Sequence, residues 1–237
     1  MKWEHFFEKG VLLRFVCICG TSNPTCTKAC RLRKGKDMMI KKITGGVTAA
    51  KGFEAAGVSA GIKYQDRMDM ALVYSKAPCV LAGTFTSNQV KAAPVLWDQQ
   101  IVQLSSSGQA VIVNAGIANA CTGQEGMNYC KRTAARAAQA LGIPENAVLV
   151  ASTGVIGMQL PMEKIEAGVE KLAAQKADTL EAGDSAARAI MTTDTVSKQA
   201  AAQIEVGGVP VTIGGMSKGS GMSHPNMCTM LAFVTTD

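Results

Sequence analysis

The order of apolar patterns along the chain constrains the fold more than any other feature of the sequence. Short apolar runs and two-residue alternation, which are typical of strands, dominate residues 40–114. Three- and four-residue spacing, which is typical of helices, follows up to residue 191, and alternation returns after residue 204. Strands followed by helices and then by strands indicate an α+β fold, a layered sheet/helix sandwich, rather than a regularly alternating parallel sheet.

Within the strand-rich part, residues 40–58 combine Gly, Ala, Thr and Val in a pattern of strands and turns. Residues 70–86 predict two apolar strands around a turn at residues 76–78. A short buried strand is expected over residues 109–114, and another over residues 147–152 that runs into Thr153 and Gly154.

The helical part predicts three helices. The first covers residues 127–141 and stops at Gly142, the second begins near Pro161, and the third covers residues 177–191 with Gly183 as a possible break. Alternating apolar residues around Gly207-Gly208 predict a hairpin, and the apolar run from Met230 predicts a last strand.

The first 38 residues differ from the rest of the chain. They contain eight Lys and Arg against three Asp and Glu, and also four of the eight cysteines. We expect residues 1–38 to be a disordered extension or upstream sequence that is not native, with Met38 or Met39 as the true start. The folded domain is then expected over residues 39–228.

Charge and composition exclude several function classes. Outside the extension the chain has 16 basic and 15 acidic residues, so it has little electrostatic support for nucleic-acid binding. Aromatic residues, at 5%, are too scarce for stacking platforms. No stretch reaches the roughly 18 apolar residues of a membrane span. We therefore expect neither a nucleic-acid nor a membrane partner.

Familiar catalytic and metal-binding arrangements are also missing from the sequence. Only two histidines occur, His5 and His224, and the cysteine spacing of the extension does not match paired zinc ligands. The scattered cysteines fit buried thiols in a reducing compartment. The glycine-rich run 214–221 lacks the order of a phosphate-binding loop. We therefore expect no metal and no organic cofactor.

The segment after that glycine-rich run offers a nucleophile. Thr229 stands directly before an apolar strand, and a Thr hydroxyl attacks well only beside a base. If the bond between Cys228 and Thr229 is cut, the new α-amine, whose ordinary pKa is about 7.7–8.0, can serve as that base.

Six separated segments resemble the N-terminal part of one enzyme family. They are GGVTAAKGFEAAGVSAGIK from Gly45, KAAPVL from Lys91, ANACTGQEG from Ala118, ASTGVIGMQLPMEKI from Ala151, AIMTTDT from Ala189 and GGMSKGSGMSHPNMCTMLAFVTTD from Gly214. In this order they are similar to the ornithine acetyltransferase (glutamate N-acetyltransferase) family of arginine biosynthesis. Members of that family cut themselves before a Thr into two subunits that stay together.

The resemblance implies roles for particular residues. Thr229 becomes the nucleophile and Cys228–Thr229 the scissile bond, although the family more often has Ala before the Thr. Thr153 and Gly154 match the family's oxyanion hole, whose donors stabilise the tetrahedral intermediate. Thr192 and Lys218 match substrate-binding residues. Residues 39–228 are then the N-terminal subunit, and residues 229–237 begin the second.

The resemblance also implies a reaction. The acetyl group of N2-acetylornithine passes to Thr229 and then to glutamate, and some members also accept acetyl-CoA as donor and act as N-acetylglutamate synthases. The expected partner is the chain's own second subunit in a heterotetramer, and the expected location is the cytoplasm.

Two departures from the family's pattern, Ala115 for Ser and Ile117 for Asn, remove polar groups from one loop.

Two alternatives remain open. One is a self-cleaving aminopeptidase of related architecture, in which water replaces glutamate as the acceptor. The other is a non-catalytic, truncated fragment, because the family's further substrate contacts lie beyond Asp237 and this chain alone is expected to be inactive.

Overall fold

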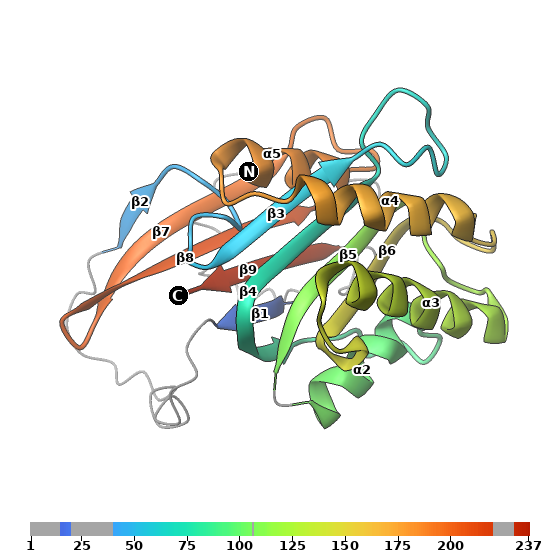
Figure 1. Ribbon diagram of the computed structural model, residues 1–237, viewed down its shortest axis with the longest axis horizontal. Helices are drawn as coiled ribbons and strands as arrows, with labels where there is room; N and C mark the ends of the chain where they lie inside the picture. Colours follow the sequence, from blue (N-terminus) through green and yellow to red (C-terminus); the bar gives the residue numbers. More distant parts are fainter. Residues whose placement is uncertain (1–14, 20–39, 106, 220–229) are drawn as a thin grey trace.

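The computed structural model of the protein describes residues 15–19, 40–105, 107–219 and 230–237. These residues contain nine strands and four α-helices, with most of the helices in the middle of the chain (Figure 1). In chain order they are β1 (Phe15–Cys19), β2 (Lys41–Ile43), β3 (Phe53–Val58), β4 (Met70–Gly83), α2 (Ala93–Leu104), β5 (Gly108–Ile117), α3 (Gly123–Leu141), β6 (Val148–Val155), α4 (Met162–Gln175), α5 (Leu180–Ala189), β7 (Lys198–Val206), β8 (Val209–Lys218) and β9 (Leu231–Thr236).

The strands form a hydrogen-bonded network with the order β2-β7-β8-β9-β1-β4-β5-β6, and β3 pairs with β4 beside this path. Side chains of a strand point alternately to opposite faces, and β4 shows which layer each face contacts. Met70 and Leu72 belong to the core cluster formed with α3 and α4, whereas Ala71 and Val73 belong to the cluster that contains Met216 of β8.

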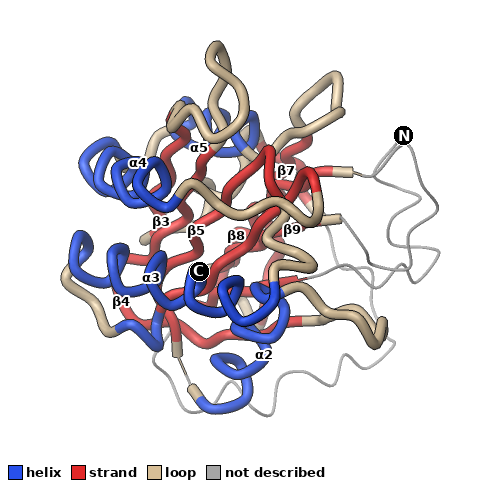
Figure 2. Tube along the Cα trace, turned by 90° about the vertical axis from the view of Figure 1, so that its right-hand side faces the viewer, coloured by secondary structure: helices blue, strands red, loops and turns tan. Residues whose placement is uncertain are grey.

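The molecule is therefore layered. Helices α3 and α4 cover one face of the β3-β4-β5-β6 part, and strands β8 and β9 pack against its other face (Figures 1 and 2). Helix α5 packs so closely on β3 that a Cβ at Gly57 would lie 2.2 Å from the backbone oxygen of Ser185. The mixed α+β class and the layered arrangement predicted from the sequence are confirmed.

Residues 70–83 form one strand, so the predicted turn at residues 76–78 is wrong. The pairing of β4 with β5 shifts between Tyr74 and Cys79, which is a bulge rather than a reversal of the chain. Pro78 lies inside this irregular segment, where a residue without a backbone N–H does not interrupt a ladder. Beyond the bulge, Val80–Gly83 pair with β1 instead.

The hairpin and the helix ends follow the sequence signals. β7 and β8 are joined at Gly207 and Gly208, whose φ values of +60° and +83° suit glycine. Helix α3 ends at Gly142 in the left-handed conformation. Helix α5 begins at the cap Thr179, whose hydroxyl accepts the N–H of Ala182, and it continues through Gly183 without a break.

The predicted extension contributes one strand. Residues 1–38 were expected to lie outside the fold, but the backbone of β1 pairs parallel with β9 and antiparallel with β4. The run Phe15–Cys19 (FVCIC) is rich in residues that favour strands, so it can fill a position between two strands. The rest of the predicted division of the chain stays a prediction.

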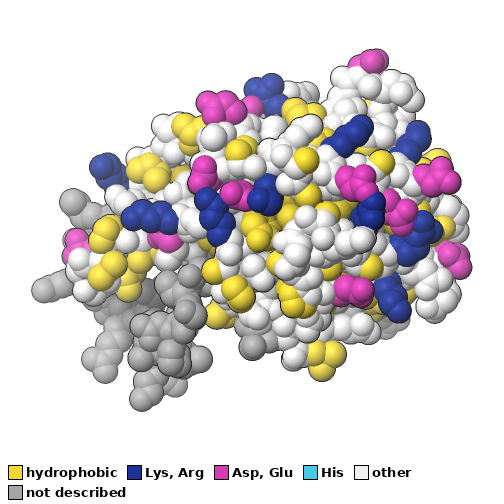
Figure 3. All heavy atoms as spheres, viewed as in Figure 1, with side chains coloured by type: hydrophobic (Ala, Val, Ile, Leu, Met, Phe, Trp, Pro, Cys, Tyr) yellow, Lys and Arg dark blue, Asp and Glu magenta, His cyan; other side chains and the backbone are white. Residues whose placement is uncertain are grey.

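In the part of the chain that the structure describes, no helix is both long enough and apolar enough to cross a membrane. On the face shown in Figure 3, basic and acidic side chains are intermingled rather than separated. This distribution agrees with the nearly balanced charge of the sequence outside its first 38 residues.

Candidate active site

Thr153 and Gly154 lie near the end of β6, where it pairs in parallel with β5. Their partners in the ladder are Ala115 and Gly116. Gly154 has a φ of +135°, and a Cβ there would lie 2.2 Å from the carbonyl carbon of Gly116. Only glycine fits this close approach of two backbones. Both residues lie inside the strand, whereas the sequence had placed them directly after it.

Lys218 contacts Thr153 from the opposite layer. Its Nζ lies 3.2 Å from Thr153 Oγ1, and the two residues are only 3% and 4% exposed. Lys218 ends β8, whereas Thr153 belongs to β6, so the contact spans the space between the facing strands. An ammonium group has donors only, so the Thr153 oxygen is the acceptor and its own proton can be donated to another group.

Thr192 lies in the segment between α5 and β7. Arg67 fixes the backbone of this segment, because its Nη1 donates to Thr192 O at 3.1 Å and its Nη2 donates to Met191 O. The Arg67 guanidinium itself stacks on Tyr64, 4.7 Å from the ring centre. The hydrogen bond described for Thr192 is thus one that its backbone oxygen accepts from Arg67, and it does not involve Lys218.

The structure adds a residue that the sequence reasoning missed. Asp194 Oδ1 accepts the backbone N–H of Gly219 at 3.0 Å and pairs with Lys198 Nζ at 2.5 Å. It therefore connects the segment of Thr192 to the end of β8. The only available signal was its place in the AIMTTDT segment, two residues after Thr192, and the charge of one Asp among many does not stand out.

The proposed nucleophile lies outside the described residues. Thr229, Cys228 and also His224 fall within residues 220–229, which the structure does not describe. The chain re-enters the description at Met230, immediately before β9, and leaves it after Gly219, immediately after β8. Because β8 and β9 are adjacent and antiparallel, with Lys218 opposite Leu231, the two ends of this segment lie side by side.

Buried hydrogen bonds fix the loop between β3 and β4 against β5. The Asp69 carboxylate accepts the N–H groups of Ala60 and Ile62, each at 2.7 Å, and the Asp69 backbone oxygen accepts the N–H of Ala115. Asp69 and Ala115 have no exposed surface. The Ala115 departure therefore lies at a buried position, where the strand pairing with Thr153 is made by the backbone and does not need a side-chain hydroxyl.

Cys79 and Cys130 are buried, as expected, whereas Cys121 is exposed, contrary to that expectation. Burial, followed by the charge of Asp98, raises the pKa of the Cys130 thiol to about 12. A thiol with such a pKa carries almost no thiolate at neutral pH and is a poor nucleophile. No three His, Cys, Asp or Glu side chains gather within the described part of the chain. The absence of a metal in the function stays a prediction.

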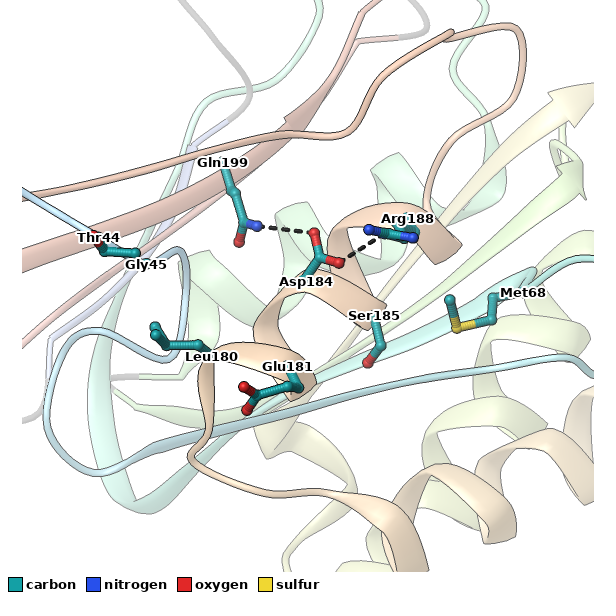
Figure 4. A pocket seen from close by; sticks show the side chains of 9 residues that line it. All are labelled: Thr44, Gly45, Met68, Leu180, Glu181, Asp184, Ser185, Arg188 and Gln199. Carbon is teal, nitrogen blue, oxygen red and sulfur yellow. Dashed lines mark hydrogen bonds and ion pairs between the residues drawn. The ribbon is translucent and has the colours of Figure 1, made fainter.

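The structure also contains a surface pocket of about 370 Å³ over α5 and β7. Figure 4 shows Asp184 at its centre, where it accepts a hydrogen bond from Gln199 Nε2 at 3.0 Å and pairs with Arg188 at 2.7 Å. Thr153, Gly154, Thr192 and Lys218 are absent from its lining. This pocket is therefore separate from the residues that the sequence selected.

Comparison with protein families places most of the chain in one of them. The model of the ArgJ family matches residues 54–237. The arginine biosynthesis bifunctional protein ArgJ of Symbiobacterium thermophilum is 54% identical over 197 residues, which cover 82% of this chain and 48% of that protein. The protein of the same name from Thermosynechococcus vestitus is 50% identical, with coverage of 83% and 46%. The chain spans about half the length of these curated relatives.

Two solved structures share the fold. The crystal structure of arginine biosynthesis bifunctional protein ArgJ from Bacillus halodurans has a TM-score of 0.77 and 42% identity, covering 82% of this chain and 100% of that chain. Ornithine acetyltransferase from Mycobacterium tuberculosis, crystallised with ornithine, has a TM-score of 0.72 and 45% identity, covering 79% and 98%. The resemblance drawn from the six sequence segments is confirmed.

Proposed function

This chain belongs to the ArgJ family, and we propose that it supplies the N-terminal half of an acetyl-transfer site. In the proposed reaction an acetyl group passes from N2-acetylornithine to glutamate within arginine biosynthesis. The observation that carries the proposal is the buried contact between Lys218 and Thr153, which brings a cation beside the expected oxyanion site.

The chemistry follows from the roles of these groups. The hydroxyl of Thr229 attacks the acetyl carbonyl, and the α-amine that cleavage after Cys228 would free takes up its proton. The negative oxygen of the tetrahedral intermediate is stabilised by the Thr153 hydroxyl and the Gly154 N–H. The C–N bond then breaks, and ornithine leaves with a proton on its amine. The α-amine of glutamate attacks the acetyl-threonyl ester and restores the Thr229 hydroxyl.

The other residues serve binding. The ammonium of Lys218 pairs with a substrate carboxylate, and Thr192 contacts the substrate from the segment fixed by Arg67. The remaining contacts come from a second subunit, with which the chain forms a heterotetramer in the cytoplasm. Acetyl-CoA is a further candidate donor. No cofactor enters the proposed steps, and this chain alone is inactive.

The test is an assay of ornithine release from N2-acetylornithine, with and without glutamate. The chain is assayed alone and together with the C-terminal half of a relative. We expect repeated turnover only from the complemented protein with glutamate present. Without glutamate, release should stop at about one ornithine per active site, because the acetyl-threonyl ester then has no acceptor. Continued turnover without glutamate would instead support the aminopeptidase-like alternative, in which water is the acceptor. No release in any arm would support the non-catalytic fragment.

Thr153→Val should lower kcat in the complemented enzyme by about 100- to 1,000-fold, because removing one oxyanion donor costs roughly that factor. Valine keeps the shape and the burial of the side chain but has no hydroxyl. The thermal midpoint of unfolding is measured in parallel, and Ser152→Ala, which removes a neighbouring hydroxyl that donates to Asn114, serves as the control. An unchanged kcat in Thr153→Val would remove Thr153 from the proposed oxyanion site.

A further inference from the structure

Asp194 is a carboxylate buried beside the candidate site. Its side chain is only 5% exposed, and Oδ1 carries both described hydrogen bonds, from the Gly219 N–H and from Lys198 Nζ. Oδ2 is buried and has no hydrogen-bond partner among the residues that the structure describes. A buried carboxylate oxygen without a donor is costly, so its retention calls for an explanation.

Asp194 carries a negative charge in this environment. Burial alone raises the pKa of its carboxyl, but the hydrogen bonds from Lys198 and from the Gly219 N–H, together with the charges of Lys198 and Lys218, outweigh burial and lower that pKa. The charge therefore persists at neutral pH. That charge acts on the two ammonium groups beside it, Lys198 and Lys218.

Lys218 is the neighbouring group whose charged form the carboxylate of Asp194 stabilises. Burial lowers the pKa of its ammonium group, Asp194 opposes that change, and the positive charge of Lys198 adds to it. The described groups around this cluster are Thr153 on β6, Lys198 on β7 and the Gly219 N–H after β8. Asp194 is the negative one among them.

We propose that Asp194 is a positioning residue that keeps Lys218 in its ammonium form and fixes the backbone where β8 ends. The two actions come from different properties of the same carboxylate, its charge and its acceptor oxygen. The inference rests on the proposed role of Lys218 in binding a substrate carboxylate, since only a protonated Lys218 can form that ion pair.

The first test measures the ionisation of Lys218 in this chain without any need for activity. Heteronuclear NMR of the Lys218 side chain over a range of pH reports the midpoint at which its ammonium group loses a proton, and it needs no access for a reagent. In Asp194→Asn we expect this midpoint to fall, because the opposing charge is gone. At a fixed pH below the midpoint, the neutral fraction of Lys218 should then increase several-fold.

Asp178→Asn is the matched control, since Asp178 is an exposed carboxylate that pairs with Lys76 away from the site. It should leave the Lys218 midpoint unchanged. Circular dichroism shows whether each variant is folded. A folded Asp194→Asn variant with the wild-type Lys218 midpoint would overturn the proposed electrostatic action.

A second variant separates charge from hydrogen bonding. The side-chain amide in Asp194→Asn would still offer an oxygen to the Gly219 N–H, whereas Asp194→Ala offers none. Hydrogen exchange at the Gly219 amide should therefore be faster in Asp194→Ala than in Asp194→Asn, while both variants lower the Lys218 midpoint. Equal exchange in the two variants would overturn the backbone-fixing action. Ornithine release is scored separately, so failure of the proposed reaction and failure of this inference give different results.

Discussion

Replacing Gly154 by Ala is expected to lower the free energy of unfolding by about 4 kcal/mol, from backbone strain and overpacking together. The φ of +135° at this position is strained for any residue with a Cβ. The added methyl would also meet the carbonyl carbon and oxygen of Gly116 at 2.2 and 2.3 Å. Since those atoms belong to the backbone of β5, the clash cannot be relieved by rotating a side chain. Unfolding in urea measures the change.

Gly157→Ala is the matched control for this prediction. Gly157 also has a positive φ, +78°, but nothing lies within 4 Å of a Cβ built on it. It should cost only about 1 kcal/mol, the strain of a left-handed residue without the clash. If the two variants were equally stable, the close approach of β5 and β6 would not be what requires glycine at position 154.

Replacing Thr229 by Ala should abolish both proposed activities, self-cleavage and acetyl transfer. In the proposal the Thr229 hydroxyl attacks the acetyl carbonyl, and we expect the same hydroxyl to attack the Cys228 carbonyl during self-cleavage, so its removal leaves no group for either step. Intact-mass measurement of the complete protein should show one uncut chain. Ornithine release should fall to the level of a blank.

Thr229→Ser is the informative comparison, since it keeps the hydroxyl and removes only a methyl group. We expect it to cleave and to retain measurable ornithine release. Equal ornithine release from Thr229→Ala and the wild type would contradict the threonine mechanism. An uncut wild-type chain in an active preparation would contradict the proposed activation by cleavage.

Local sequence signals predicted much of the fold because the corresponding structure is local. The β7–β8 hairpin follows from alternating apolar residues around two glycines, and α3 follows from its periodic apolar face and Gly142. Helix α2 was missed for a tertiary reason. Its inner face contains the charged residue Asp98, which is 3% exposed and accepts the N–H of Val150 at 2.9 Å. An apolar pattern in the sequence cannot predict that a buried Asp accepts a hydrogen bond from a distant strand.

The candidate site also combines features that the sequence predicts with features that depend on tertiary packing. The residues of the site were selected through the family resemblance, and Thr153 and Gly154 also stand where a strand was expected to end. The meeting of Lys218 with Thr153, 65 positions apart in sequence, depends on one part of the sheet packing on another. Asp194 acts through a backbone N–H that no side-chain pattern encodes. Periodicity describes which face a residue occupies but not which residue faces it from the other layer.

Lys218 and Thr153 belong to facing layers, so their contact reports whether the two layers have come together during folding. Lys218 is buried only when β8 lies against β6, so its amine becomes accessible to reagents as soon as these layers part. The time course of Lys218 labelling during refolding would therefore record the assembly of the layers. Circular dichroism over the same period would record the formation of strands and helices, and any delay between the two signals would measure how late the layers dock.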